Sequence, residues 1–127
     1  MGIISDYQVR EIIKYCLKTC GCEKLPVKWN WFDVLENDAL GHAEFQWEKP
    51  GKVKICEIMI SRYELIKSDI STQIITITHE ICHLISWFFY GTQIEEHGIE
   101  WQNMMKKCGI SEPEAYYYEN KELLYAN

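Results

Sequence analysis

Apolar residues recur at helical spacing in several stretches of the chain and alternate with polar residues in others. The first helical stretch follows Ser5 and ends before Gly21, and it predicts an N-terminal helix. Ser5 and Gln8 have the spacing of a capping box, in which the two residues satisfy each other's backbone N–H groups. Gly21 is typical of a residue that ends a helix.

Three segments in the first half have the pattern of β-strands. Residues 27–32, just after Pro26, alternate between apolar and polar side chains. Residues 41–47 and 52–61 are separated by a Pro-Gly turn signal. Apart from Lys54 and Glu57, segment 52–61 is almost continuously apolar from Val53 to Ile60, so it predicts a well-covered strand.

The second half predicts helices. A short helix is expected near residues 63–66, and a long one from about residue 72 to residue 90, where Gly91 ends it. Another helix is expected to begin at His97 and to end at Gly109. A final helix is expected after Ser111. The chain therefore predicts a small α+β domain spanning residues 1–127, with a sheet of about three strands, a central helix and a second helix after it.

Length and composition agree with one compact domain. The chain has 127 residues, of which 47% are apolar and 13% aromatic, enough for a hydrophobic core. The net charge of −6 argues against a domain whose whole surface binds nucleic acid. No signal-peptide pattern and no apolar run of about 18 residues is present, so we expect a cytoplasmic monomer without membrane contact. The six cysteines are then expected as reduced thiols.

The candidate chemistry lies in the long central helix. Its apolar residues cover most of the helix circumference, which predicts a buried helix; they are Ile74, Ile75, Ile77, Ile81, Leu84, Ile85, Trp87, Phe88 and Phe89. Within this run, His79 and His83 are four positions apart and point the same way. Glu80 is rotated from His79 by about 100°. An H-E-x-x-H pattern on a helix indicates two metal ligands and a general base.

A catalytic zinc ion is usually held by three protein ligands, so a third ligand is expected elsewhere. His97 is the strongest candidate, because a short connector and a returning helix could bring it beside the first pair. Glu95, Glu96 and Glu100 are the alternatives. A different interpretation has two core histidines with Glu80 turned to solvent. Burying three polar groups without a partner would cost several kcal/mol, which argues against it.

The residues "HEICH" at 79–83 and "HGIEW" at 97–101 resemble the SprT-like zinc metalloproteases, the family that includes Spartan. The resemblance extends over most of positions 5–108 and implies a zincin-like fold. It implies that His79, His83 and His97 bind Zn²⁺ and that Glu80 is catalytic. It also implies structural roles for Gly98, which would shape the turn, and for Trp101, which would anchor the helix. Many members carry a C-terminal zinc ribbon, whereas the tail after Cys108 contains no cysteine, so no ribbon is expected here.

These residues predict a zinc metallopeptidase that hydrolyses peptide bonds through a metal-activated water, with Glu80 as general acid/base. The partner would be a protein or peptide, extended along the strand at 41–47 or the strand at 54–61. Two alternatives remain. One is a zincin-like binding module without catalysis. The other is a DNA-directed protease, which the resemblance suggests and the acidic charge does not support.

His42 is the fourth histidine and is expected to be a surface or packing residue. Tyr116, Tyr117 and Tyr118 are expected to pack against the core, although a phenol can also stabilise an oxyanion.

Overall fold

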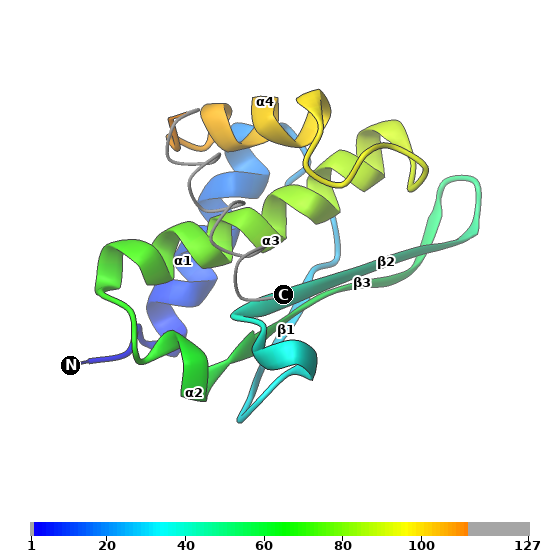
Figure 1. Cartoon of the computed structure of the whole chain (residues 1–127). Helices are drawn as coiled ribbons and strands as arrows, with labels where there is room; N and C mark the ends of the chain where they lie inside the picture. Colours follow the sequence, from blue (N-terminus) through cyan, green and yellow to red (C-terminus); the bar gives the residue numbers. More distant parts are fainter. Residues whose placement is uncertain (1, 112–127) are drawn as a thin grey trace.

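The computed structural model describes residues 2–111 (Figure 1). Its helices and strands are α1 (Asp6–Thr19), β1 (Lys28–Phe32), the 3₁₀ turn η1 (Glu36–Asp38), β2 (Gly41–Lys49), β3 (Lys52–Ser61), α2 (Arg62–Leu65), α3 (Ile70–Tyr90) and α4 (Ile99–Lys107). The predicted C-terminal helix and Tyr116, Tyr117 and Tyr118 lie outside the described residues.

The strands form one sheet in the order β1-β3-β2, which confirms the small α+β architecture with three strands. Strand β3 is central. It runs parallel to β1, with Trp29 opposite Ile58, and antiparallel to β2, with Ala43 opposite Ile58. Cys56, Ile58 and Ile60 on one face of β3 are buried, whereas Ile55 and Met59 on the other face are half-buried, so the strand is well covered on one face only. Strand β2 lies at an edge of the sheet and keeps one side of its backbone unpaired within it.

Helix α3 lies between the sheet on one side and helices α1 and α4 on the other (Figure 1). This middle position explains its apolar circumference, because both of its sides are covered. Twelve residues of α3 are buried, and the run from Thr76 to Ser86 is buried without interruption. None of the helices in residues 2–111 is both long and apolar enough to cross a bilayer.

The helix starts follow local capping chemistry. Ser5 and Gln8 form the predicted capping box at the start of α1. Helix α3 begins two residues earlier than predicted, because the Asp69 side chain accepts a hydrogen bond from the backbone N–H of Thr72. Gly91 ends α3 with a positive φ of 90°, a conformation that favours glycine.

One predicted position is wrong. We expected a helix to begin at His97, which would make it a second ligand-bearing helix. Instead, α4 begins at Ile99 with Gly98 as its N-cap, and His97 lies in the turn before it. Gly98 follows His97 directly, and glycine is a favourable N-cap residue, so the helix begins one residue after Gly98 and two after His97.

All six cysteines are free and buried. Three helices bring some of them together, and the Sγ atom of Cys108 lies 3.8 Å from that of Cys20 and 3.9 Å from that of Cys82. Cys82 belongs to α3, whereas Cys20 and Cys108 are the C-caps of α1 and α4. The thiols therefore pack where these three helices meet.

Candidate metal centre

Helix α3 presents His79 and His83 one turn apart and both buried, with 1% and 3% of their surfaces exposed. Their Nε2 atoms lie 3.1 Å apart. Two residues four positions apart on a helix share a face, so the helix itself sets this spacing. The pair predicted from the sequence is therefore present as a pair of convergent imidazoles.

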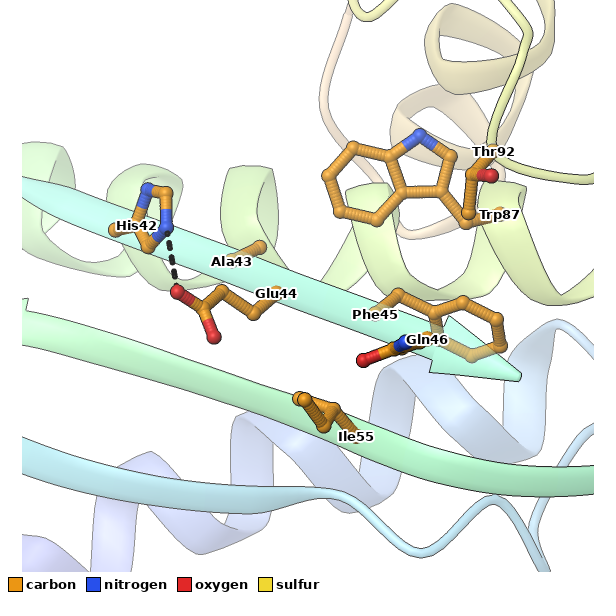
Figure 2. Close-up of a pocket in the computed structure, with 8 residues that line it drawn as sticks. All are labelled: His42, Ala43, Glu44, Phe45, Gln46, Ile55, Trp87 and Thr92. Atoms are coloured by element: carbon orange, nitrogen blue, oxygen red, sulfur yellow. Dashed lines mark ion pairs between the residues drawn. The ribbon is translucent and has the colours of Figure 1, made fainter. Parts of the chain in front are cut away.

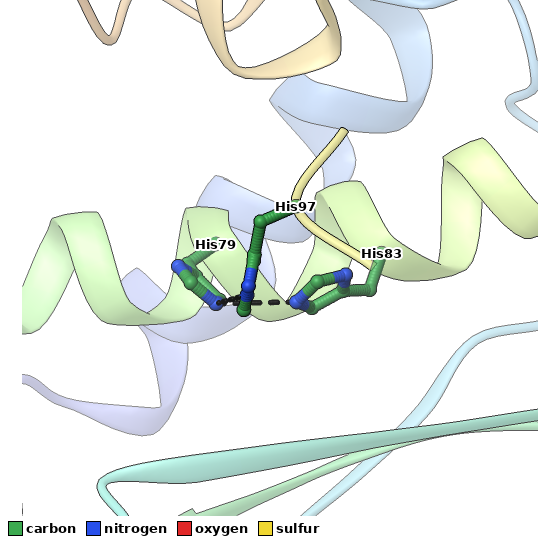
Figure 3. Close-up of side chains that lie close together, drawn as sticks. All are labelled: His79, His83 and His97. Atoms are coloured by element: carbon green, nitrogen blue, oxygen red, sulfur yellow. Dashed lines mark hydrogen bonds between the residues drawn. The ribbon is translucent and has the colours of Figure 1, made fainter. Parts of the chain in front are cut away.

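His97 approaches the same point from the turn before α4, and Figure 3 shows it between the two helix histidines. Its Nε2 atom lies 3.1 Å from that of His79. The turn is held from both sides: Gly98 N–H donates to the carbonyl of Glu95, and the Gln102 side chain donates to the carbonyl of His97. Local hydrogen bonds thus position the third imidazole.

The three imidazoles fit a metal ion. A tetrahedral zinc with Zn–N bonds of about 2.0–2.1 Å separates its ligand nitrogens by about 3.3 Å, close to the 3.1 Å seen for both pairs that involve His79. A neutral ring nitrogen carries either a proton or a lone pair, so His79 Nε2 cannot donate to one neighbour while accepting from the other. A single cation accepts the lone pairs of all three nitrogens at once.

Among residues 2–111, these histidines are the one group of three or more ligand-type side chains that could hold a metal ion, and their ligand atoms all lie within 4.8 Å of one another. Glu95, Glu96 and Glu100, the alternatives considered for the third ligand, do not belong to it. His42 does not belong to it either; its side chain is exposed on β2 and lies 3.5 Å from the Glu44 carboxylate.

Trp101 contacts the rings of all three histidines. It is fully buried, and its indole N–H donates to the backbone carbonyl of His79 at 3.1 Å. Its ring stacks on His83 at 5.5 Å and meets the rings of His79 and His97 edge-on at 4.7 and 4.8 Å. The resemblance implied only a structural anchor for α4, whereas the contacts give Trp101 a role in orienting all three rings.

Trp87 also contacts one of the three histidines. Its ring stacks on His83 at 5.2 Å with an angle of 17° between the planes. We had not predicted this contact. The signal was available, because Trp87 follows His83 by four positions on the same helix.

Burial keeps the helix histidines neutral. Desolvation lowers the pKa of His79 well below its ordinary value, and His83 and His97 lower it further. The pKa of His83 is lowered to about 3 by desolvation and by the neighbouring His97 and His42, while a backbone hydrogen bond with Glu96 opposes the shift. Neutral imidazole is the form that binds metals, so the rings are ready to act as ligands at neutral pH.

These shifts predict how the stability of the metal-free protein depends on pH. Both histidines bind protons in the unfolded chain below about pH 6.5 but not in the folded one until a much lower pH. Stability is therefore highest above pH 6.5 and falls as the pH drops towards the folded-state pKa, by about 1.4 kcal/mol per pH unit for each histidine. Urea unfolding in the presence of a chelator measures this slope. The double variant His79→Gln, His83→Gln should lose most of it; an unchanged slope would contradict the assignment.

Glu80 is 3% exposed, so its side chain is inside the protein. This rules out the interpretation in which Glu80 turns to solvent. The residue lies on α3 next to His79 and packs against the start of β2, where its Cγ and carboxylate approach Gly41. A buried carboxylate therefore lies between the metal-ligand helix and the edge strand.

A cavity of about 360 Å³ runs along β2, and His42 is the one histidine that lines it (Figure 2). Figure 2 shows Trp87 and Thr92 on one side of it and the strand on the other, with Phe45 and Ile55 contributing apolar surface. Because Trp87 also stacks on His83, this cavity adjoins the three-histidine centre.

The fold and the site together define a small α+β protein with a three-histidine centre suited to a metal ion. The chain belongs to the SprT-like family, whose model matches residues 10–120. Searches of curated proteins and of solved structures gave no match.

Proposed function

We propose that this protein is a zinc-dependent metalloprotease that hydrolyses peptide bonds, with His79, His83 and His97 as the zinc ligands and Glu80 as general acid/base. The observation that carries the proposal is the convergence of three buried or partly buried imidazoles on one point, beside a buried glutamate of the same helix. Membership of the SprT-like family supports it.

When bound, zinc supplies Lewis-acid chemistry, since it lowers the pKa of a coordinated water and polarises a carbonyl. The protein's own part is proton transfer and orientation. Glu80 would take the proton from the attacking water and return it to the leaving amine, so that neither a strong base nor a free amide anion is formed. Trp101 and Trp87 would keep the histidine rings in place through their ring contacts.

The sheet supports β2 as the strand that binds an extended substrate. Strand β3 already has hydrogen-bonded neighbours on both sides, which leaves no backbone edge for a peptide. Strand β2 lies at the sheet edge and packs against α3, the helix that carries two of the ligands. A peptide added along β2 would pass the histidines, and its side chains could enter the cavity between Phe45 and Trp87.

The experiment that tests this function is cleavage of an unfolded protein such as casein. We expect zinc-loaded wild type to produce fragments, a chelator to stop the reaction, and added zinc to restore it. Parallel reactions with single-stranded DNA test the DNA-directed alternative, in which DNA would raise the rate. A folded, zinc-loaded protein that leaves the substrate intact with and without DNA would contradict the proposal and favour a binding module.

A further inference from the structure

Gly41 is the first residue of β2, and it is buried on the side of the strand that faces α3. Backbone contacts with β3 fix its position. Gly41 is paired with Ile60, and the carbonyl of the preceding Leu40 accepts a hydrogen bond of 3.0 Å from the backbone N–H of Ser61. The position of its Cα atom relative to α3 is therefore set by the sheet.

The backbone does not require glycine here. Positive φ angles occur at Gly21, Gly51, Gly91 and Gly109, whereas Gly41 has none. Any L-residue can adopt this conformation in an edge strand, and glycine weakens a strand relative to other residues. The glycine at position 41 is therefore explained by a lack of room for a side chain at this position.

Glu80 occupies that space. A Cβ atom on residue 41 would lie 2.9 Å from Cγ of Glu80, 3.0 Å from its Oε2 and 3.2 Å from its Cδ. All three of the nearest atoms belong to this one side chain. The closest, Cγ, is only two bonds from the helix backbone, so moving it requires a new χ1 rotamer inside a buried helix, where few are allowed.

We propose that Gly41 is a positioning residue for Glu80: the missing side chain at the start of β2 leaves the room in which the Glu80 carboxylate lies, on the helix that carries His79 and His83. The catalytic part of this inference rests on the proposed function of Glu80; the packing part does not. Gly41 thus lets Glu80, the general acid/base, pack directly against β2, the strand along which the substrate would bind. The strand and the carboxylate then keep a fixed position relative to each other.

The variant Gly41→Ala tests the packing part through stability. We expect its melting temperature to fall by roughly 3–6 °C, between the shifts that the same destabilisation produces in domains of about 60–100 and of about 150–250 residues. In the Glu80→Ala background the same change should have little effect, because the added methyl group enters the space that the glutamate has left. Gly2→Ala is the matched control, since nothing lies within 4 Å of a Cβ at that position.

The catalytic part is tested by kinetics. With one zinc still bound, Gly41→Ala should lower kcat roughly ten- to hundredfold and leave KM nearly unchanged, because the carboxylate is displaced rather than the substrate site. The acidic limb of the pH–rate profile should also move, which a purely structural role would not cause.

Equal loss of melting temperature in the wild-type and Glu80→Ala backgrounds would overturn the inference. This comparison does not depend on enzymatic activity, so it holds even where Gly41→Ala is too unstable for kinetic measurements. A normal kcat and pH profile in a folded Gly41→Ala protein would overturn its catalytic part. If wild type itself proves inactive, the proposed function fails, whereas the stability comparison still decides whether Gly41 makes room for Glu80.

Discussion

Replacing Glu80 by glutamine is expected to lower kcat for peptide hydrolysis by about 10²–10⁴-fold, the usual contribution of a general acid/base. Glutamine has nearly the same shape as glutamate, so it should fit the space beside Gly41 without a new clash. It cannot accept a proton from water at neutral pH. The histidines are untouched, so bound zinc and melting temperature should remain close to those of wild type.

The measurement is the rate of substrate cleavage by zinc-loaded Glu80→Gln, with zinc content determined on the same sample. Glu100→Gln is a matched control, because it makes the same chemical change in the first turn of α4, outside the three-histidine group. Equal rates for wild type and Glu80→Gln would remove the catalytic role of Glu80 and favour the binding-module alternative.

Replacing His97 by alanine is expected to weaken zinc binding more than any change in the residues that surround the ligands. Loss of a group that only orients a ligand typically costs 10–100-fold in metal affinity, so loss of a ligand should cost at least about 100-fold. Peptide hydrolysis should disappear with the metal. Competition with a chromophoric chelator measures the affinity directly.

His42→Ala provides the comparison, because His42 is exposed on β2 and its imidazole does not belong to the three-histidine group. Its zinc affinity should equal that of wild type. Unchanged affinity in His97→Ala would mean that the third ligand lies elsewhere, with Glu95, Glu96 and Glu100 as the residues to replace next.

Local patterns in the sequence were enough to predict most elements. The capping box at Ser5, the alternation in β1, the turn between β2 and β3, and the stop at Gly91 all depend on neighbouring residues, and the structure contains each of them. The pairing of His79 with His83 is equally local, since one helical turn sets it.

Contacts between distant segments could not be predicted in the same way. Nothing in the strand sequences specifies that β1 pairs with β3 in parallel, so the sequence left two candidate strands for the substrate. Trp101 was expected as an anchor, but its contact with all three histidine rings depends on how α4 packs on α3. Likewise, only the approach of β2 to α3 shows why residue 41 is glycine.

The position of His97 relative to α4 is a smaller difference between prediction and structure. The position of His97 near the other histidines was predicted. The predicted start of the helix was wrong by two residues, because α4 begins at Ile99 and not at His97. Helix boundaries depend on which residue caps them, and patterns of apolar spacing define them only to within a few residues.

We expect His79, His83 and His97 to hold one metal ion together. The most direct measurement is an anomalous difference map from crystals of the zinc-loaded protein, collected at the zinc absorption edge. We expect one strong peak between the three Nε2 atoms, about 2.0–2.1 Å from each. A map without a peak at that position, or with its strongest peak at the glutamates of 95–100 or at the thiols around Cys108, would contradict this expectation.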